Sequence, residues 1–204
     1  MATLVTDPRL EERLKQQRRA SGADRYDEVW EGVYMMAPLP NNEHRQMVLR
    51  LAMVLEEVVG LGGAGEVYPG VNLAGPGDDW EHDFRVPDLA VFLRGGAAED
   101  CGTHWRGPAD FLVEITSPGD QTREKFPFYD RIEVAELLLI DRDPWTLELF
   151  RRREGRLTKV GQSCLPFGDM LASQSLGLAF QLIASHPRPR IQVIHPATGR
   201  RWLA

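Results

Sequence analysis

Three nearly continuous apolar segments mark the middle of the chain, at residues 86–93, 109–116 and 135–141. Each has about the length of one β-strand, and none shows the regular polar alternation of a half-exposed strand. Strands that are apolar on both faces are covered on both sides, as in layered α/β folds. These segments therefore predict the central strands of an α/β protein.

Two other segments have the spacing of amphipathic helices. Residues 7–20 place Leu10 and Leu14 among charged residues, which predicts a short peripheral helix. A second apolar stripe follows the candidate N-caps Asn41 and Asn42 and stops at a glycine-rich segment, which predicts a core-packing helix. Its apolar positions are Val48, Leu51, Leu55 and Val58.

The remaining apolar segments alternate with polar residues and predict outer strands. In a strand over residues 29–36, this alternation places Glu31 on the same face as the apolar Val29 and Val33. Further strands are expected at 66–75, in a hairpin of 146–153 and 156–161, and in a hairpin within 190–204.

Length and composition limit the classes of protein to which the chain can belong. The chain has 204 residues, 43% hydrophobic and 26% charged, which is typical of one globular domain with small additions. Its cysteines, Cys101 and Cys164, are far apart and indicate neither a disulfide framework nor a structural zinc site. With no apolar run near the roughly 18–20 residues that span a bilayer and no signal-peptide block, we expect a cytoplasmic protein without a membrane partner.

The net charge is −6, from 24 Lys and Arg against 30 Asp and Glu, which excludes indiscriminate coating of nucleic acid or anionic membranes. The charge is unevenly distributed, because residues 142–204 hold ten Lys and Arg against four Asp and Glu and residues 1–141 carry the acidic excess. Chance variation of surface charge and a basic end that contacts phosphate both explain this asymmetry, and the sequence leaves both open.

Two carboxylates interrupt the apolar strands. Asp88 stands at the start of one segment, and Glu114 lies near the end of the next. An ionised carboxylate inside a core is costly unless it is paired or bound to a metal ion. If the two strands pair, both acids project into one site about 5 Å or a little more apart, and such hard oxygen ligands suit Mg²⁺ or Mn²⁺.

Lys125 supplies the third element of a candidate site. It follows Glu114 in a segment that begins with turn residues and becomes helix-like. A lysine beside a metal site can orient an attacking water and stabilise the charge that develops on a phosphate. Two acids, a lysine and a divalent metal ion together are a set of groups that can hydrolyse a phosphodiester bond.

A spaced set of residues covering roughly 25–160 is together fairly specific. The set consists of Val86-Pro87-Asp88, Glu114-Ile115-Thr116-Ser117-Pro118, Lys125 with Tyr129, the segment from Glu136 to Asp141, Glu31-Gly32 and His44. It resembles the Uma-two family of endonucleases, which belongs to the PD-(D/E)XK, restriction-endonuclease-like superfamily.

The resemblance implies a fold of the α/β (α+β) class, with a restriction-endonuclease-like mixed β-sheet flanked by helices. This domain is expected over residues 23–184. An N-terminal helical extension is expected over 1–22, and a short hairpin-like β extension over 185–204. By analogy with the superfamily, we also note a homodimer as a candidate assembly.

The resemblance further implies a Mg²⁺- or Mn²⁺-dependent endonuclease that acts on DNA. Asp88 and Glu114 would be the metal ligands, and the main-chain carbonyl of Ile115 an additional ligand. Lys125 would be the catalytic lysine that assists the attacking water.

One departure from the superfamily pattern leaves an alternative open. The superfamily lysine stands two residues after the acid, where this chain has Thr116. Lys125 would replace it from the following helix, although Pro127 is comfortable only in a helix's first turn, and Arg123 is a rival cation. If neither cation reaches the carboxylates, the protein is a catalytically silent module that binds a nucleic acid or protein partner.

Three further residues each have two interpretations. Glu31 either folds toward the same metal or pairs with an arginine. His44 lies in helical register with Val48, which favours a packing or hydrogen-bonding role behind the ligands over a place among them. Tyr129 either belongs to the site or is a buried ring on a solvated helix.

Overall fold

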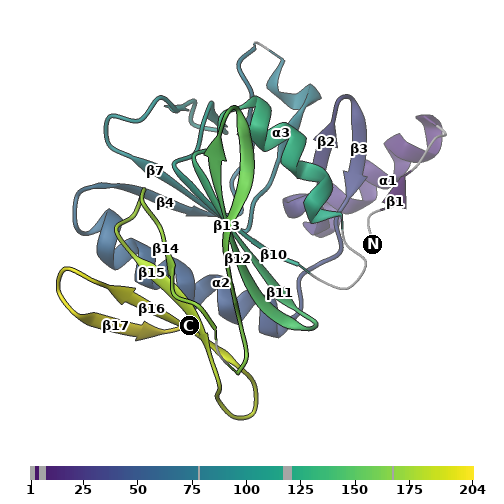
Figure 1. Cartoon of the computed structure of the whole chain (residues 1–204). Helices are drawn as coiled ribbons and strands as arrows, with labels where there is room; N and C mark the ends of the chain where they lie inside the picture. Colours follow the sequence, from purple (N-terminus) through teal and green to yellow (C-terminus); the bar gives the residue numbers. More distant parts are fainter. Residues whose placement is uncertain (1–2, 5–7, 78, 117–120, 167) are drawn as a thin grey trace.

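The computed structural model describes residues 3–4, 8–77, 79–116, 121–166 and 168–204. Within them, a central mixed sheet has six strands in the order β13-β12-β11-β10-β7-β4 (Figure 1). Strands β10 and β11 run parallel, and the other neighbours are antiparallel. The strands are β4 (Gly65–Pro69), β7 (Leu89–Leu93), β10 (Phe111–Ile115), β11 (Glu136–Arg142), β12 (Trp145–Arg153) and β13 (Arg156–Cys164).

Two further sheets flank this centre, one with seven short strands and one with four. One has the order β1-β3-β2-β6-β5-β9-β8, and a C-terminal sheet has the order β14-β15-β16-β17. The first contains β1 (Thr3–Leu4), β2 (Glu28–Trp30), β3 (Val33–Met36), β5 (Leu73–Ala74), β6 (Phe84–Arg85), β8 (Glu99–Asp100) and β9 (Trp105–Arg106). The second contains β14 (Leu171–Ala172), β15 (Ala179–Ile183), β16 (Arg190–His195) and β17 (Arg200–Leu203).

The helices are short, and none in the described part of the chain has the length and apolarity needed to cross a membrane. The α-helices are α1 (Pro8–Ser21), α2 (Asn42–Leu55) and α3 (Phe126–Arg131). Single turns of other helix types are η1 (Ala23–Tyr26), η2 (Glu56–Gly60), η3 (Trp80–His82) and η4 (Thr122–Lys125).

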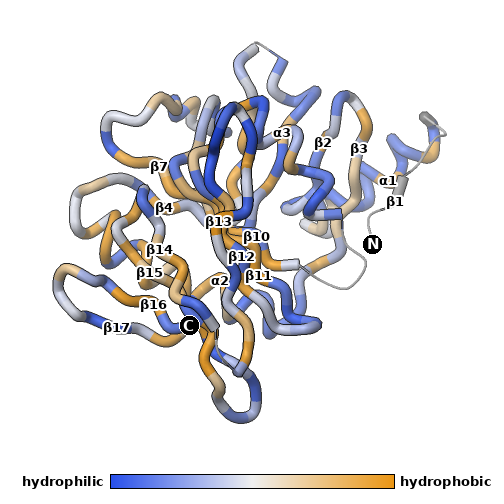
Figure 2. The backbone as a smooth tube through the Cα atoms, viewed as in Figure 1, coloured by the Kyte–Doolittle hydropathy of each residue, from blue (hydrophilic) through white to orange (hydrophobic). Residues whose placement is uncertain are grey.

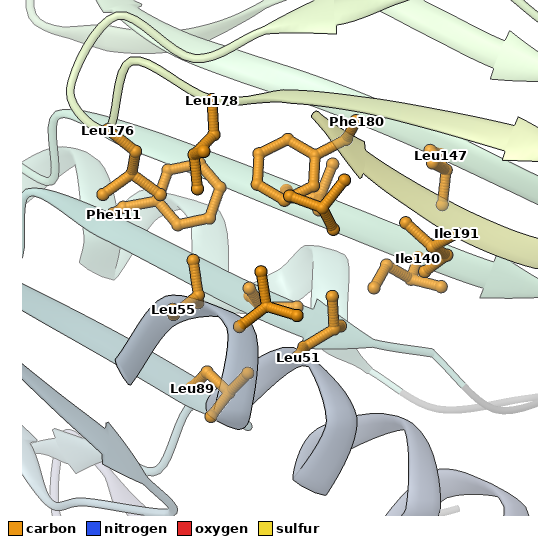
Figure 3. Packing of buried hydrophobic residues seen from close by; sticks show 14 of the residues in the cluster. Leu51, Leu55, Leu89, Phe111, Ile140, Leu147, Leu176, Leu178, Phe180 and Ile191 are labelled. Atoms are coloured by element: carbon orange, nitrogen blue, oxygen red, sulfur yellow. The ribbon is translucent and has the colours of Figure 1, made fainter. Parts of the chain in front are cut away.

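The alternation of side chains divides the core into two layers, one on each face of the central sheet. On one face, α2 and the C-terminal sheet cover Phe111 and Ile140, and Figure 3 shows Leu51 and Leu55 of α2 pointing into the same cluster as Phe180. The opposite face carries α3 and the seven-stranded sheet. The central strands are largely hydrophobic, whereas the tip of the β12–β13 hairpin is hydrophilic (Figure 2).

The structure confirms the predicted mixed α/β architecture and its main elements. The three apolar segments form β7, β10 and β11, and the amphipathic stripes form α1 and α2. Asn41 is the N-cap of α2, because its side chain accepts a hydrogen bond from the His44 N–H at 2.9 Å. The hairpins expected near 155 and 199 are β12–β13 and β16–β17. The division of the chain at residues 22 and 184 stays a prediction.

The expectation of one continuous strand over residues 29–36 was wrong. Residues 31 and 32 instead form a two-residue hairpin turn between β2 and β3, with φ of 51° at Glu31 and 84° at Gly32. Positive φ at both central residues gives a turn whose twist matches that of the flanking strands. The segment 66–75 is likewise divided, because Gly70 has φ of +63° and separates β4 from β5.

Glu136, at the start of β11, links the central sheet to residues 173–175 by hydrogen bonds. Its carboxylate is 1% exposed and accepts hydrogen bonds from the Arg151 Nε at 2.7 Å and the Ser173 hydroxyl at 2.6 Å. The backbone N–H groups of Gln174 and Ser175 donate to the same carboxylate at 3.1 and 3.0 Å. Four donors therefore balance the cost of burying this charge.

We expect Glu136→Ala to lower the free energy of unfolding by about 3 kcal/mol, because it leaves a partly buried guanidinium and a buried hydroxyl without their acceptor. Urea denaturation measures this loss. The matched control is Glu99→Ala, since Glu99 is 69% exposed and lies 3.9 Å from Arg106, and its expected cost is below about 0.5 kcal/mol. Equal losses in the two variants would contradict the assigned role of Glu136.

Candidate active site

Asp88 and Glu114 lie on neighbouring strands at the same end of the central sheet. In the antiparallel register of β7 and β10, Leu89 pairs with Val113, so that the next pair along is Asp88 and Glu114. The Ile115 N–H also donates to the Asp88 Oδ2 at 2.8 Å. The two carboxylates that interrupt the apolar strands are thus brought together at this end of the sheet, where Glu114 faces α3 and Asp88 contacts α2.

Lys125 reaches the carboxylates from the junction of η4 and α3. Its Nζ lies 3.0 Å from the Glu114 Oε1. Tyr129, one helical turn further, is fully buried and donates its hydroxyl hydrogen to the same oxygen. Pro127 lies in the first turn of α3, where a missing N–H and a fixed φ are tolerated. The proline that complicated this segment in the sequence is therefore compatible with its geometry.

Glu28 is a site residue that the sequence analysis missed. It is 5% exposed, and its Oε1 lies 2.8 Å from the Lys125 Nζ and accepts from the Val86 N–H at 2.8 Å. Its Oε2 accepts from the Trp30 Nε1 at 2.6 Å. The Glu31-Gly32 pair was the available signal, because such a pair can form a two-residue hairpin turn. If residues 31–32 form a turn, Glu31 lies in the turn, and Glu28 is the glutamate in the strand before it.

Two residues nominated from the sequence lie outside this cluster. The Glu31 side chain is 77% exposed at the hairpin turn and lies 3.6 Å from Arg131. Arg123 is 57% exposed and pairs with Glu148. The structure thus places Glu31 in an arginine pair rather than beside the carboxylates, and makes Lys125 the cation that reaches Glu114.

His44 stands behind Asp88. It lies in the first turn of α2, and its Nε2 is 2.6 Å from the Asp88 Oδ1. With the Ile115 N–H on the other oxygen, both oxygens of Asp88 are held in place. Thr116, at the place of the superfamily lysine, is buried. Ser117 and Pro118 lie outside the described residues.

These side chains line a cleft of about 330 Å³. Asp88, Glu114 and Lys125 form its charged floor, and its walls come largely from the hairpin and the proline-rich segment before α2. Trp30, Met35, Pro38 and Leu39 make most of the wall apolar. Apolar walls around a charged floor strengthen electrostatic interactions there, because they exclude water.

Burial raises the pKa of Glu114 to about 8; the Lys125 charge acts against this rise, and the Asp88 and Glu28 charges add to it. Burial alone would lower the pKa of Lys125, but Glu114 and Glu28 outweigh it and raise the pKa above its ordinary value. Burial likewise raises the pKa of Tyr129. At neutral pH the cluster therefore holds a charged lysine and a Glu114 that readily takes up a proton.

The oxygen atoms at the cleft floor fit a hard divalent cation. Mg²⁺ commonly takes one or two carboxylates and keeps several waters, so two acids and a main-chain carbonyl are sufficient donors. Glu114 Oε2 accepts no hydrogen bond from the described residues and is available for such a role. Within these residues, no group of three or more His, Cys, Asp or Glu side chains could hold a metal ion, so water would complete the shell.

Comparisons with known proteins agree with this geometry. The model of the Uma2 family, described as "Putative restriction endonuclease", matches residues 11–185. A solved structure of "a putative nuclease belonging to DUF820 from Anabaena variabilis ATCC 29413" has a TM-score of 0.53 and 18% sequence identity, over 65% of this chain and 75% of that chain. No curated protein matches the chain. The solved structure supports the fold, and the family match extends over most of the sequence, so the chain belongs to the Uma2 (Uma-two) family.

Proposed function

We propose that the protein is an endonuclease that hydrolyses DNA phosphodiester bonds and depends on a divalent metal ion. One observation carries the proposal: Lys125 Nζ lies 3.0 Å from Glu114, which adjoins Asp88 on the floor of an open cleft. This arrangement gives a lysine and two acids a shared space where a phosphate and a water can meet. Family membership supports a nucleic-acid substrate.

In this proposal, Asp88, Glu114 and the Ile115 carbonyl hold Mg²⁺ or Mn²⁺. The bound ion would supply Lewis-acid stabilisation of the phosphate charge and favour ionisation of a water molecule. Lys125 donates a hydrogen bond to the attacking water or to a phosphate oxygen and stabilises the developing negative charge.

The surrounding residues hold these groups in position. Glu28 keeps Lys125 charged and directed toward Glu114, since it lies 2.8 Å from the Nζ. His44 and Tyr129 fix one oxygen each of Asp88 and Glu114. Such supporting hydrogen bonds orient ligands and reduce the reorganisation needed during reaction.

The alternative, a silent module that binds without hydrolysis, stays a hypothesis. Thr116 at the usual lysine position, Pro127 and the acidic net charge of −6 favour it. The contact of Lys125 with Glu114 favours the hydrolytic proposal over it, because the missing strand lysine has a spatial replacement. A cytoplasmic location and a homodimer likewise stay predictions.

We expect Glu114→Gln to lower plasmid nicking in Mg²⁺ or Mn²⁺ by at least about 100-fold, because it removes one of the two acidic ligands. The matched control is Glu31→Gln, which changes an exposed glutamate outside the cleft and should keep wild-type activity. Equal nicking by wild type and Glu114→Gln would exclude the proposed chemistry. DNA binding without nicking in every divalent metal would support the silent module.

We expect isothermal titration calorimetry to show binding of Mn²⁺ that Asp88→Asn weakens about 10-fold or more, because the amide loses the charge of the carboxylate ligand. Asp100→Asn is the control, since Asp100 is exposed on β8, away from the cleft. Identical titrations for wild type and Asp88→Asn would show that Asp88 is not a ligand.

The raised pKa of Glu114 predicts a pH-dependent stability in EDTA. The folded state keeps a proton that the unfolded state releases above about pH 4.5, so this contribution to stability is present below 4.5 and is lost as the pH rises through about 8. Glutamine mimics the neutral acid and does not titrate. We therefore expect the melting temperature of wild type to fall relative to that of Glu114→Gln between about pH 4.5 and 8. Parallel curves would contradict the shift.

A further inference from the structure

A second groove, of about 430 Å³, lies beside the first turn of α2, where Asn42 and Glu43 line it while Asn41 and His44 line the cleft. We name it the arginine groove. The C-terminal sheet lies beside α2 (Figure 1), and the segment that leads into β16 forms one wall of the groove. Its polar lining consists of Asn42, Glu43 and Gln46 from α2 and His186, Arg188 and Arg190 from the C-terminal segment.

The arginine groove carries an excess of positive charge. Glu43 is the carboxylate in its described lining, and it accepts from two guanidinium groups, Arg188 at 2.6 Å and Arg142 at 3.2 Å. The second arm of Arg188 donates to Gln46 at 2.8 Å. The Arg190 side chain makes no hydrogen bond or ion pair with the described residues, and it is half-buried in the groove wall.

The groove and the cleft share the N-terminal end of α2. Asn41 caps the helix, lines the cleft and accepts from the Arg142 guanidinium at 3.3 Å. Arg142 also donates to the Thr116 carbonyl at 3.3 Å, directly after the strand that carries Glu114. The first backbone N–H groups of a helix and its dipole favour an anion at this end. A negatively charged strand that lies in the cleft can therefore continue toward the arginine groove.

The C-terminal wall of the groove is outside the family match, which ends at residue 185. Residues 186–204 contain no Asp or Glu, and two of their four arginines, Arg188 and Arg190, line the groove. Guanidinium groups bind phosphate oxygens in a bidentate manner, and each phosphate contact on DNA releases counterions. The charge of this wall thus complements a phosphodiester backbone.

We propose that the arginine groove binds a backbone phosphate of the same DNA whose scissile phosphate lies in the cleft, with Arg188 and Arg190 as the contacts. The inference rests on the proposed nuclease function and adds to it a phosphate-binding site formed by the C-terminal segment. Contacts of this kind position the duplex and contribute affinity without reading its sequence.

Arg190→Ala tests the inference, with Arg201→Ala as the matched control. Neither side chain has a hydrogen-bond or ion-pair partner among the described residues, so neither change should unfold the sheet. Arg201 pairs across the sheet with Ile194, near the end of α2 where Arg200 contacts Glu57. Glu43 and Glu57 are separated by about 20 Å along the helix, which places the control far from the groove.

Fluorescence anisotropy with a labelled duplex in EDTA measures affinity across a salt series. We expect Arg190→Ala to weaken binding about tenfold at low salt, equally for unrelated sequences, and to reduce the slope of log affinity against log salt by about 0.9. Arg201→Ala should change affinity less than about twofold. Arg190→Glu should weaken binding more than Arg190→Ala.

Failure of this inference and failure of the proposed function give different results. If wild type binds and nicks DNA while Arg190→Ala and Arg201→Ala have equal affinities and salt slopes, the phosphate site is excluded and the nuclease proposal stands. If Arg190→Ala changes the oligomeric state in size-exclusion chromatography and leaves the salt slope unchanged, the groove is an interface between copies. If wild type neither binds nor nicks DNA, both proposals are overturned.

Discussion

A buried lysine shared by two buried carboxylates is the interaction on which the rest of the site depends. Lys125 Nζ lies 2.8 Å from Glu28 and 3.0 Å from Glu114, and both acids are almost fully inaccessible. The Lys125 charge alone would be expensive to bury, and it is tolerated because these two acids lie beside it. Three elements that are distant in sequence, β2, β10 and the η4–α3 junction, must therefore meet in one arrangement.

The same constraint explains how a lysine can leave its usual place on the strand. The proposed chemistry would require a positive charge beside Glu114, and any backbone position from which a lysine reaches this point could supply it. Thr116 occupies the strand position, and Lys125 reaches the carboxylate from the start of α3, which Pro127 helps to begin. Glu28 gives this lysine a second contact, because its Oε1 lies 2.8 Å from the Lys125 Nζ.

The sequence predicts those site residues whose charge interrupts an otherwise apolar strand. Asp88 and Glu114 are conspicuous because they stand in apolar strands, and the pairing of β7 and β10 then brings them together. Glu28 has no such background, since it follows Asp27 at the start of a three-residue strand and gains its role through contacts with Lys125 and Val86. Because Glu31 has positive φ and lies in a turn, the side-chain alternation expected for one strand over residues 29–36 does not hold. Long-range contacts and turn geometry, rather than periodicity, decide these positions.

Helix α2 connects the hydrophobic core to the cleft. Leu51 and Leu55 bury one side of it against the central sheet, while His44 in its first turn holds Asp88. The C-terminal part of the chain contacts the start of α2 through Arg188, which donates to Glu43 at 2.6 Å, and the adjoining turn η2 through the Trp202 Nε1, which donates to Glu57 at 2.9 Å. A segment beyond the family match therefore contacts the element that orients an acid of the cleft. Because packed cores resist small displacements, the burial of Leu51 and Leu55 holds α2, and with it His44, against the central sheet.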